Sequence, residues 1–329
     1  MSQPLLQVNH LSIQFPLGRD RVFSAVDDLS FSVEAGRTLA IVGESGCGKS
    51  ITALALMRLL PDTAWLGGDV HFEGQNLARL SERAMRRVRG NRLSIIFQDP
   101  MAALNPVLTI GDQIVEAVQA HEPIGRAAAR NRAVELLDLV RIPEPRQRFD
   151  EYPHRFSGGM RQRAAIAMAL ASSPSLLIAD EPTTALDVTI QAQILSLLHR
   201  LQRELGMGLI LITHDLGVVA EIADEVLVMY AGRKVEHQDV HGLFDAPRHP
   251  YTQRLMGARP RPGTGTARVR LQEIPGMVPA AGEHVDGCSF ASRCDRATER
   301  CRTESPVLRH LDGARVACHH ADETLTEAA

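Results

Sequence analysis

LAIVGESGCGKS, at residues 39–50, decides the fold because it joins an apolar run to a glycine-rich loop and a helix. The run at residues 39–42 shows no polar alternation, which is typical of a strand buried on both faces. Residues 50–56 read SITALAL and form a good helical run. A strand, a glycine-rich loop and a helix in this order predict a nucleotide phosphate site.

The residue types in the loop suit phosphate chemistry. Gly43, Gly46 and Gly48 allow backbone N–H groups to turn toward phosphate oxygens, and the helix N-terminus adds partial positive charge. Lys49 supplies a point charge to the β- and γ-phosphates, and the Ser50 hydroxyl ligates Mg²⁺. The other residues assigned to the ATP site are Glu44, Ser45, Cys47 and Ile51, with Cys47 interpreted as a packing residue.

Two carboxylates close a second apolar run. Residues 176–181 read LLIADE, so Asp180 and Glu181 stand at the end of a buried strand, where a charge needs a positive partner. Asp180 suits an outer contact to Mg²⁺, and Glu181 suits the polarisation of a water that attacks the γ-phosphate. The alternative, a helix N-cap in front of Pro182, is disfavoured by the phosphate loop upstream.

The alternation of strand and helix patterns indicates the fold class. Continuous apolar runs predict further buried strands at residues 209–212 and 226–229. Longer periodic segments predict helices at residues 126–140 and 190–205. This alternation predicts an α/β fold with a mostly parallel core sheet. Residues 5–33 read as short alternating strands around a turn at 16–18, which predicts an antiparallel N-terminal subdomain.

A change in composition marks a boundary near residues 245–260. The chain becomes rich in Pro and Gly at residues 257–265, and residues 275–282 are similar. We therefore predict an ATP-binding domain at residues 1–255, with a helical subdomain at about 100–170, and a small Cys-rich C-terminal extension at residues 256–329.

Composition and charge argue against several classes of protein. The formal net charge is −3, so a general nucleic-acid binder is not expected, and the arginines between Arg79 and Arg92 are interpreted as a solvated helix face. Every apolar stretch falls short of the roughly 20 residues that span a bilayer, and the N-terminus lacks the signal-peptide pattern. We expect a soluble chain whose work at a membrane would be done from the cytoplasmic side.

The order of the motifs resembles that of the ATP-binding cassette (ABC) ATPases. Residues 157–163 read SGGMRQR and match the cassette signature motif at Ser157, Gly158, Gly159 and Met160, with Met in place of the common Gln. The resemblance gives roles to four more residues: Gln98 at Mg²⁺ and the attacking water, Asp187 in the D-loop, His214 as the switch histidine, and Phe15 stacked on adenine. Phe23 is the alternative for the adenine contact.

The signature motif also predicts a second anion site. Two glycines precede an Ala-rich helical run at residues 163–171, whose N-terminus carries partial positive charge. One nucleotide cannot easily be reached by both loops of one chain, so the resemblance implies a head-to-tail dimer. ATP would lie between residues 43–50 of one subunit and residues 157–160 of the other; binding would close the dimer and hydrolysis would release it.

Longer phrases resemble the ATPase subunits of dipeptide/oligopeptide importers, and the match runs over nearly the whole chain. They are FQDPM at 97–101, LNP at 104–106, YPH at 152–154, PTTALDVT at 182–189, DLGVVA at 215–220 and HPYT at 249–252. This resemblance implies a peripheral ATPase subunit on the cytoplasmic face of the inner membrane that powers peptide uptake. Its partners would be a second ATPase subunit, usually a paralogue, two membrane permeases docked on residues 100–152, and indirectly a periplasmic or extracellular peptide-binding protein.

Several other functions are alternatives to peptide import. The ATPase subunits of nickel and glutathione importers share many of these sequence motifs, so the motifs do not identify the transported substrate. DNA-repair and chromosome-organising cassettes carry long insertions between the phosphate loop and the signature, whereas here only about a hundred residues intervene, without sustained heptads. Translation-associated cassette proteins pair two cassettes in one chain, and this chain has one.

Four cysteines mark the C-terminal extension. Cys288, Cys294, Cys301 and Cys318 are separated by five, six and sixteen residues. Disulfides are not expected in a cytoplasmic chain, and four thiolates suit either tetrahedral zinc or an iron–sulfur cluster. Zinc sites favour tight Cys pairs, which are absent here, although His319 and His320 keep zinc as an alternative. The family resemblance implies a [4Fe–4S] cluster at this position; four unliganded cysteines are the remaining possibility.

Overall fold

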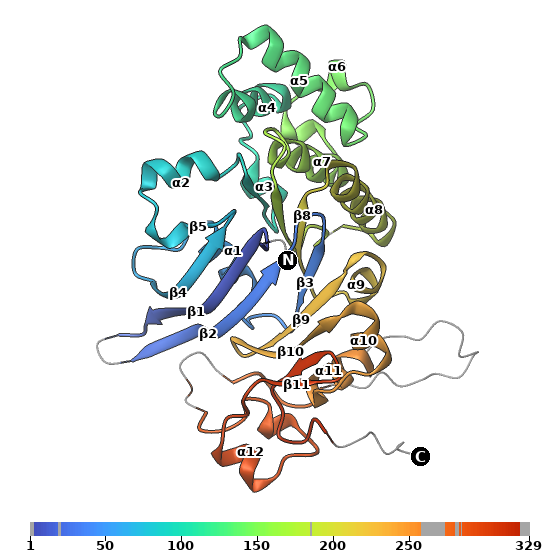
Figure 1. Ribbon diagram of the computed structural model, residues 1–329. Helices are drawn as coiled ribbons and strands as arrows, with labels where there is room; N and C mark the ends of the chain where they lie inside the picture. Colours follow the sequence, from blue (N-terminus) through green and yellow to red (C-terminus); the bar gives the residue numbers. More distant parts are fainter. Residues whose placement is uncertain are drawn as a thin grey trace, which may run out of the picture.

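The computed structural model describes residues 3–18, 21–184, 186–257, 274–279, 283 and 285–322. Two sheets form its centre, with a helical lobe at one end and the C-terminal extension at the other (Figure 1). The larger sheet has the strand order β11-β12-β10-β9-β3-β8-β7-β6, and the smaller has the order β2-β1-β4-β5.

Parallel strands form the core of the larger sheet. They are β3 (Thr38–Val42), β6 (Leu93–Ile96), β7 (Leu176–Asp180), β8 (Gly208–Thr213) and β9 (Glu225–Tyr230). Antiparallel pairing then adds β10 (Arg233–Asp239), β12 (Ala314–Val316) and β11 (Arg309–Leu311) at the β9 side. The predicted α/β class and mostly parallel core sheet are confirmed.

The continuous apolar runs arise because this sheet is covered on both faces. Along β7, Leu177 and Ala179 belong to one buried cluster, whereas Leu176 and Ile178 belong to another on the opposite face. A strand in this position must be apolar at every residue, since neither face reaches water. The pattern of the sequence therefore reports the layered architecture directly.

The antiparallel sheet covers one face of the core sheet. It consists of β1 (Leu6–Pro16), β2 (Val22–Val33), β4 (Trp65–Phe72) and β5 (Gln75–Asn76), and α1 (Lys49–Leu56) packs in the same buried cluster. After β5 follow η1 (Leu77–Arg79) and α2 (Glu82–Val88). The predicted antiparallel N-terminal part is confirmed. Strand β4 escaped prediction because Gly67 and Gly68 interrupt its apolar pattern where the ladder with β1 shifts register.

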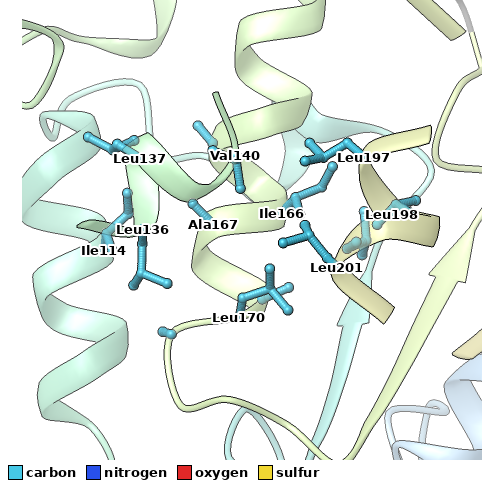
Figure 2. Close-up of a cluster of buried hydrophobic side chains, with 14 of the residues drawn as sticks. Ile114, Leu136, Leu137, Val140, Ile166, Ala167, Leu170, Leu197, Leu198 and Leu201 are labelled. Carbon is cyan, nitrogen blue, oxygen red and sulfur yellow. The ribbon is translucent and has the colours of Figure 1, made fainter. Parts of the chain in front are cut away.

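Helices α4 to α7 form the lobe at the top of Figure 1, and α3 lies below them. The segment runs through α3 (Pro100–Ala103), α4 (Ile110–Gln119), α5 (Arg126–Leu139), α6 (Pro145–Arg148), η2 (Pro153–Arg155) and α7 (Gly158–Ala169), with α8 (Val188–Leu205) beside the lobe. Figure 2 shows the core that they share, with Leu136 of α5, Ile166 of α7 and Leu198 of α8 among its side chains. This core continues onto β7 and β8, so the lobe is packed on the central sheet.

The C-terminal residues pack against the far edge of the core sheet. Here lie α9 (Leu216–Ile222), α10 (Val240–Asp245), α11 (Pro250–Gly257), η3 (Ala291–Arg293) and α12 (Glu299–Thr303). Phe290 is buried in the same cluster as Tyr230 of β9 and Tyr251 of α11. Within the described ranges, no helix combines the length and the apolar character needed to cross a membrane.

Candidate functional site

The glycine-rich loop lies between β3 and α1 and fits closely against neighbouring strands. Gly43 has a φ of 156°, and a Cβ there would stand 2.3 Å from the carbonyl oxygen of Met229 in β9. Gly48 has a φ of 101°, and its Cβ would stand 2.5 Å from the carbonyl oxygen of Ala25 in β2. Both the backbone angle and the close approach of another strand therefore require glycine at these two positions.

Lys49 opens α1 and is held inside the loop. Its Nζ donates to the carbonyl oxygens of Gly43 at 2.8 Å and Glu44 at 2.9 Å, and the residue is only 5% exposed. Cys47 Sγ lies 3.8 Å from the same ammonium. Burial raises the pKa of the Cys47 thiol, which keeps it neutral and agrees with its interpretation as a packing residue.

Ser50 and Asp180 meet at the mouth of the loop. The Ser50 hydroxyl donates to Asp180 Oδ1 at 3.0 Å. Burial raises the pKa of the Asp180 carboxyl despite this hydrogen bond, and the neighbouring Glu181 raises it further. A divalent cation would offset the cost of this buried charge, and hydroxyl and carboxylate oxygens are ligands that Mg²⁺ prefers. The donor set therefore fits Mg²⁺.

Glu181 follows directly, and its carboxylate is oriented by three side chains. Gln98 Nε2 donates to Glu181 Oε2 at 3.0 Å, the Thr184 hydroxyl donates to the same oxygen at 2.9 Å, and His214 Nδ1 lies 3.6 Å from Oε1. The backbone of Glu181 has a φ of 44°, which is strained for a residue with a side chain. Strain of this kind persists only where the surroundings hold it, and the carboxylate so fixed can accept a proton from a nearby water.

One cavity of about 1240 Å³ brings most of the predicted residues together. The site residues predicted from the sequence that line this cavity are Ser45, Gly46, Gly48, Lys49, Ser50, Ile51, Gln98, Glu181 and His214. Phe23, the alternative for the adenine contact, also lines it, whereas Phe15 is not among the lining residues and packs against the buried core beside it. Phe23 is thus better placed than Phe15 to meet a base.

The signature residues do not line this cavity. Ser157 caps α7 by accepting a hydrogen bond from the Met160 N–H at 3.3 Å, and Asp187 caps α8 by accepting one from the Ile190 N–H at 2.9 Å. A Cβ on Gly159 would stand 2.7 Å from Cγ2 of Ile190, so close packing of α7 on α8 requires this glycine. Ala185 of the predicted D-loop lies outside the described residues. A single chain therefore presents the signature away from its own phosphate loop.

A wall of the cavity was not predicted from the sequence. The C-terminal extension contributes to its lining with Val278, Pro279, Glu283, Val285, Gly287 and Ser289. These residues carry no motif, and they are more than two hundred positions from the phosphate loop, so nothing in the sequence pattern could signal the contact. The extension is part of the nucleotide cavity.

The four cysteines of the extension gather around a second, very small cavity. Cys288, Cys294, Cys301 and Cys318 line it together with His249, His319 and His320. All four are free thiols, and burial raises the pKa of Cys318 to about 11, with the other three thiols adding to the effect. Nowhere in the described part of the chain do three or more His, Cys, Asp or Glu side chains stand in position to hold a metal ion.

Comparisons with known proteins agree with this geometry. Residues 26–184 match the family model described as ABC transporter, and residues 235–301 match the model of the oligopeptide/dipeptide transporter C-terminal region. The probable peptide ABC transporter ATP-binding protein y4tR of Sinorhizobium fredii is 55% identical, over 98% of this chain and 96% of the relative. The dipeptide transport ATP-binding protein DppD of Escherichia coli is 49% identical, over 96% of each.

Solved structures share the fold. The ATP-binding cassette MJ0796, in a dimeric post-hydrolysis state with ADP and Pi, aligns with a TM-score of 0.64 at 25% identity, over 71% of this chain and 98% of that one. The cbiO1 protein of Clostridium perfringens, part of the ABC transporter complex cbiONQ, aligns with a TM-score of 0.63 at 26% identity, over 74% and 92% of the two chains.

Glu181→Gln tests the role that this geometry offers the carboxylate. We expect ATP hydrolysis to fall about 10²–10⁴-fold, because the amide keeps the shape but cannot accept a proton from water. ATP affinity, measured by titration with a labelled nucleotide, should be retained. Lys49→Ala is the matched comparison, since loss of the phosphate-facing charge should weaken ATP binding itself. Near-normal hydrolysis by the Gln variant would remove Glu181 from the role of base.

Proposed function

The chain belongs to the ABC transporter family and is an ATPase, and we propose that it powers the import of di- and oligopeptides across the cytoplasmic membrane. The observation that carries the substrate class is the match of residues 235–301 to the oligopeptide/dipeptide transporter C-terminal region. Relatives named for peptide and dipeptide transport, aligned over nearly the whole chain, support the same class.

In the proposed mechanism the nucleotide site is completed by a second subunit. Lys49 and the loop N–H groups would hold the phosphates, Ser50, Gln98 and Asp180 would hold Mg²⁺, and Glu181 would take the proton of the attacking water, with His214 beside it. The N-terminus of α7, with Ser157 at its cap, would approach the γ-phosphate from the other subunit, with Asp187 at the same interface. This arrangement is supported by the separation of the signature from the cavity within one chain.

Exposed apolar side chains on the helical lobe support docking to permeases. Met101, Val107, Leu108 and Tyr152 are large apolar side chains with 36–74% of their surface exposed. The backbone hydrogen bond from Ile110 to Glu151, at 2.9 Å, joins the segment that follows Leu108 to the one that precedes Tyr152. Exposed apolar side chains are typical of interaction surfaces when they lie on neighbouring segments, so this part of the lobe suits the cytoplasmic loops of two membrane permeases. The chain would then be a peripheral subunit on the cytoplasmic face of the membrane, paired with a second ATPase subunit.

Reconstitution of the transporter tests the proposed substrate. The complex is purified through this chain, its subunits are identified, and it is placed in vesicles with the cognate binding protein. We expect two permeases to copurify and ATP to drive the uptake of a labelled dipeptide. The same complex carrying Glu181→Gln is the control, because it shows how much labelled dipeptide enters the vesicles without ATP hydrolysis. Uptake of nickel or glutathione with no uptake of peptide would overturn the peptide assignment while leaving the ATPase intact.

We further propose that the extension, taken as residues 256–329, holds a [4Fe–4S] cluster through its four cysteines. Four thiols around one cavity are the soft ligands that iron–sulfur clusters use, and this gathering supports the proposal. Their present positions do not form a metal-holding group, so the support lies in ligand type and proximity rather than in coordination geometry. Zinc, with His319 or His320 as a ligand, is the alternative. A bound cluster would clamp a segment too small to build a core of its own.

Metal analysis of anaerobically purified protein tests the cluster. We expect brown protein with about four irons per chain. Cys294→Ser should lower the iron content and the thermal unfolding temperature, while Cys47→Ser, which changes the cysteine outside the set, should leave the iron content unchanged. Stoichiometric zinc without iron would replace the cluster by a zinc site, and four titratable thiols without metal would dismiss both.

A further inference from the structure

Arg293 lies in the cysteine-bearing extension, one position before Cys294, and its side chain reaches the phosphate loop. Only 4% of the side chain is exposed. Nη1 donates to Glu44 Oε2 at 2.7 Å and Nη2 donates to Glu44 Oε1 at 3.0 Å. The two parallel bonds form the bidentate geometry in which a guanidinium binds a carboxylate most strongly.

Every donor of this guanidinium is used. Besides the two bonds to Glu44, Nη1 donates to the Tyr230 hydroxyl at 3.3 Å, Nη2 to the carbonyl oxygen of Ile274 at 3.1 Å, and Nε to that of Pro275 at 2.9 Å. An arginine has five N–H donors, so this side chain is fully satisfied in its buried position. A guanidinium held in this way fixes the position of the Glu44 carboxylate. The contact therefore differs from the solvent-exposed ion pairs described for other parts of the chain.

Glu44 transmits this contact to the phosphate-binding lysine. Its backbone N–H donates to the Tyr251 hydroxyl at 2.8 Å, and its carbonyl oxygen accepts from Lys49 Nζ at 2.9 Å. The carboxylate, the N–H and the carbonyl of one loop residue are thus held by Arg293, Tyr251 and Lys49 respectively. Movement of Arg293 would shift Glu44 and, with it, one of the two carbonyl groups that hold the ammonium.

The surrounding packing makes the contact rigid. Phe290, also in the extension, makes edge-to-face contacts with Tyr230 and Tyr251. The ring centroids are 5.2 Å apart in the contact with Tyr230 and 5.5 Å apart in the contact with Tyr251. Tyr230 and Tyr251 are themselves in contact at 4.8 Å. The aromatic group and Arg293 therefore belong to one packed unit, which joins the cysteine segment to the end of β9 and to the loop.

We propose that Arg293 is a positioning residue of the nucleotide site, through which the folded C-terminal extension sets the affinity of the phosphate loop for ATP. The inference rests on the ATPase activity of the chain and needs neither the peptide substrate nor the cluster. It predicts that loss of this one contact weakens nucleotide binding, although Arg293 is not among the residues that line the nucleotide cavity.

The test compares ATP affinity and steady-state hydrolysis in the full-length protein. Arg293→Met keeps the aliphatic stem and removes the fork; we expect Kd and KM for ATP to rise about tenfold, as for the loss of a charged hydrogen-bond pair. At saturating ATP, kcat should stay within about threefold, because bound nucleotide restores the loop. Arg293→Lys should rescue affinity only in part, since an ammonium cannot bridge both oxygens.

Two further variants separate positioning from general damage to the extension. Arg309 also lies in the extension, where it donates to Asp322 at 2.7 Å and to the carbonyl oxygen of Cys318 at 2.8 Å. Neither partner lines the nucleotide cavity, so Arg309→Met is the matched control and should change Kd less than about twofold. Glu44→Gln keeps the loop shape and tests the contact even where Arg293→Met fails to fold.

A double-mutant cycle decides the outcome. If the two side chains act through each other, Arg293→Met and Glu44→Gln together should weaken ATP binding no more than the stronger single change. Effects that multiply, or an equal loss of affinity in Arg309→Met, would overturn the proposal. Wild-type protein that bound no ATP would instead contradict the ATPase assignment, so the two failures can be told apart.

Discussion

Parallel pairing of β3 with β8, β8 with β7 and β7 with β6 is the constraint on which the nucleotide site depends. In this register Val42 lies opposite Thr213, Ile212 opposite Asp180, and Ala179 opposite Ile96. The residues that leave these strands therefore emerge at one edge of the sheet, where ligands bind in open α/β folds. The phosphate loop, His214, Glu181 and Gln98 come from four distant parts of the sequence and meet there for this reason.

The sequence predicted what is local or periodic. Continuous apolar runs gave the buried strands, because a strand covered on both faces must be apolar throughout, and the glycine loop gave its own strand and helix. Strand β4 escaped because two glycines break its pattern at a shift of register. Within the site, most of the motif residues line one cavity, and Phe23 rather than Phe15 is among its lining residues. Those two residues face each other across the β1–β2 ladder, so only the three-dimensional fold tells them apart.

The part played by the extension could not be predicted, because it rests on contacts between distant residues of ordinary type. Arg293 and Glu44 are 249 positions apart, and neither belongs to a pattern that indicates the other. The guanidinium of this bidentate ion pair is buried, which costs desolvation and is stable only when every donor is satisfied, as it is here. The extension thereby becomes a structural element of the ATP site as well as the carrier of the four cysteines.

Mixing two inactive variants tests most directly whether each ATP site is shared between two subunits. Lys49→Ala disables the phosphate loop. Gly158→Asp places a negative charge at the N-terminus of α7, where the charge is favourable for the helix dipole but repels the phosphates of ATP. In a head-to-tail dimer, an equal mixture forms mixed dimers with one intact site, so about one quarter of wild-type hydrolysis should return in a chain that is active alone. A mixture as inactive as its two components, at a concentration where the wild-type chain hydrolyses ATP, would contradict the shared site.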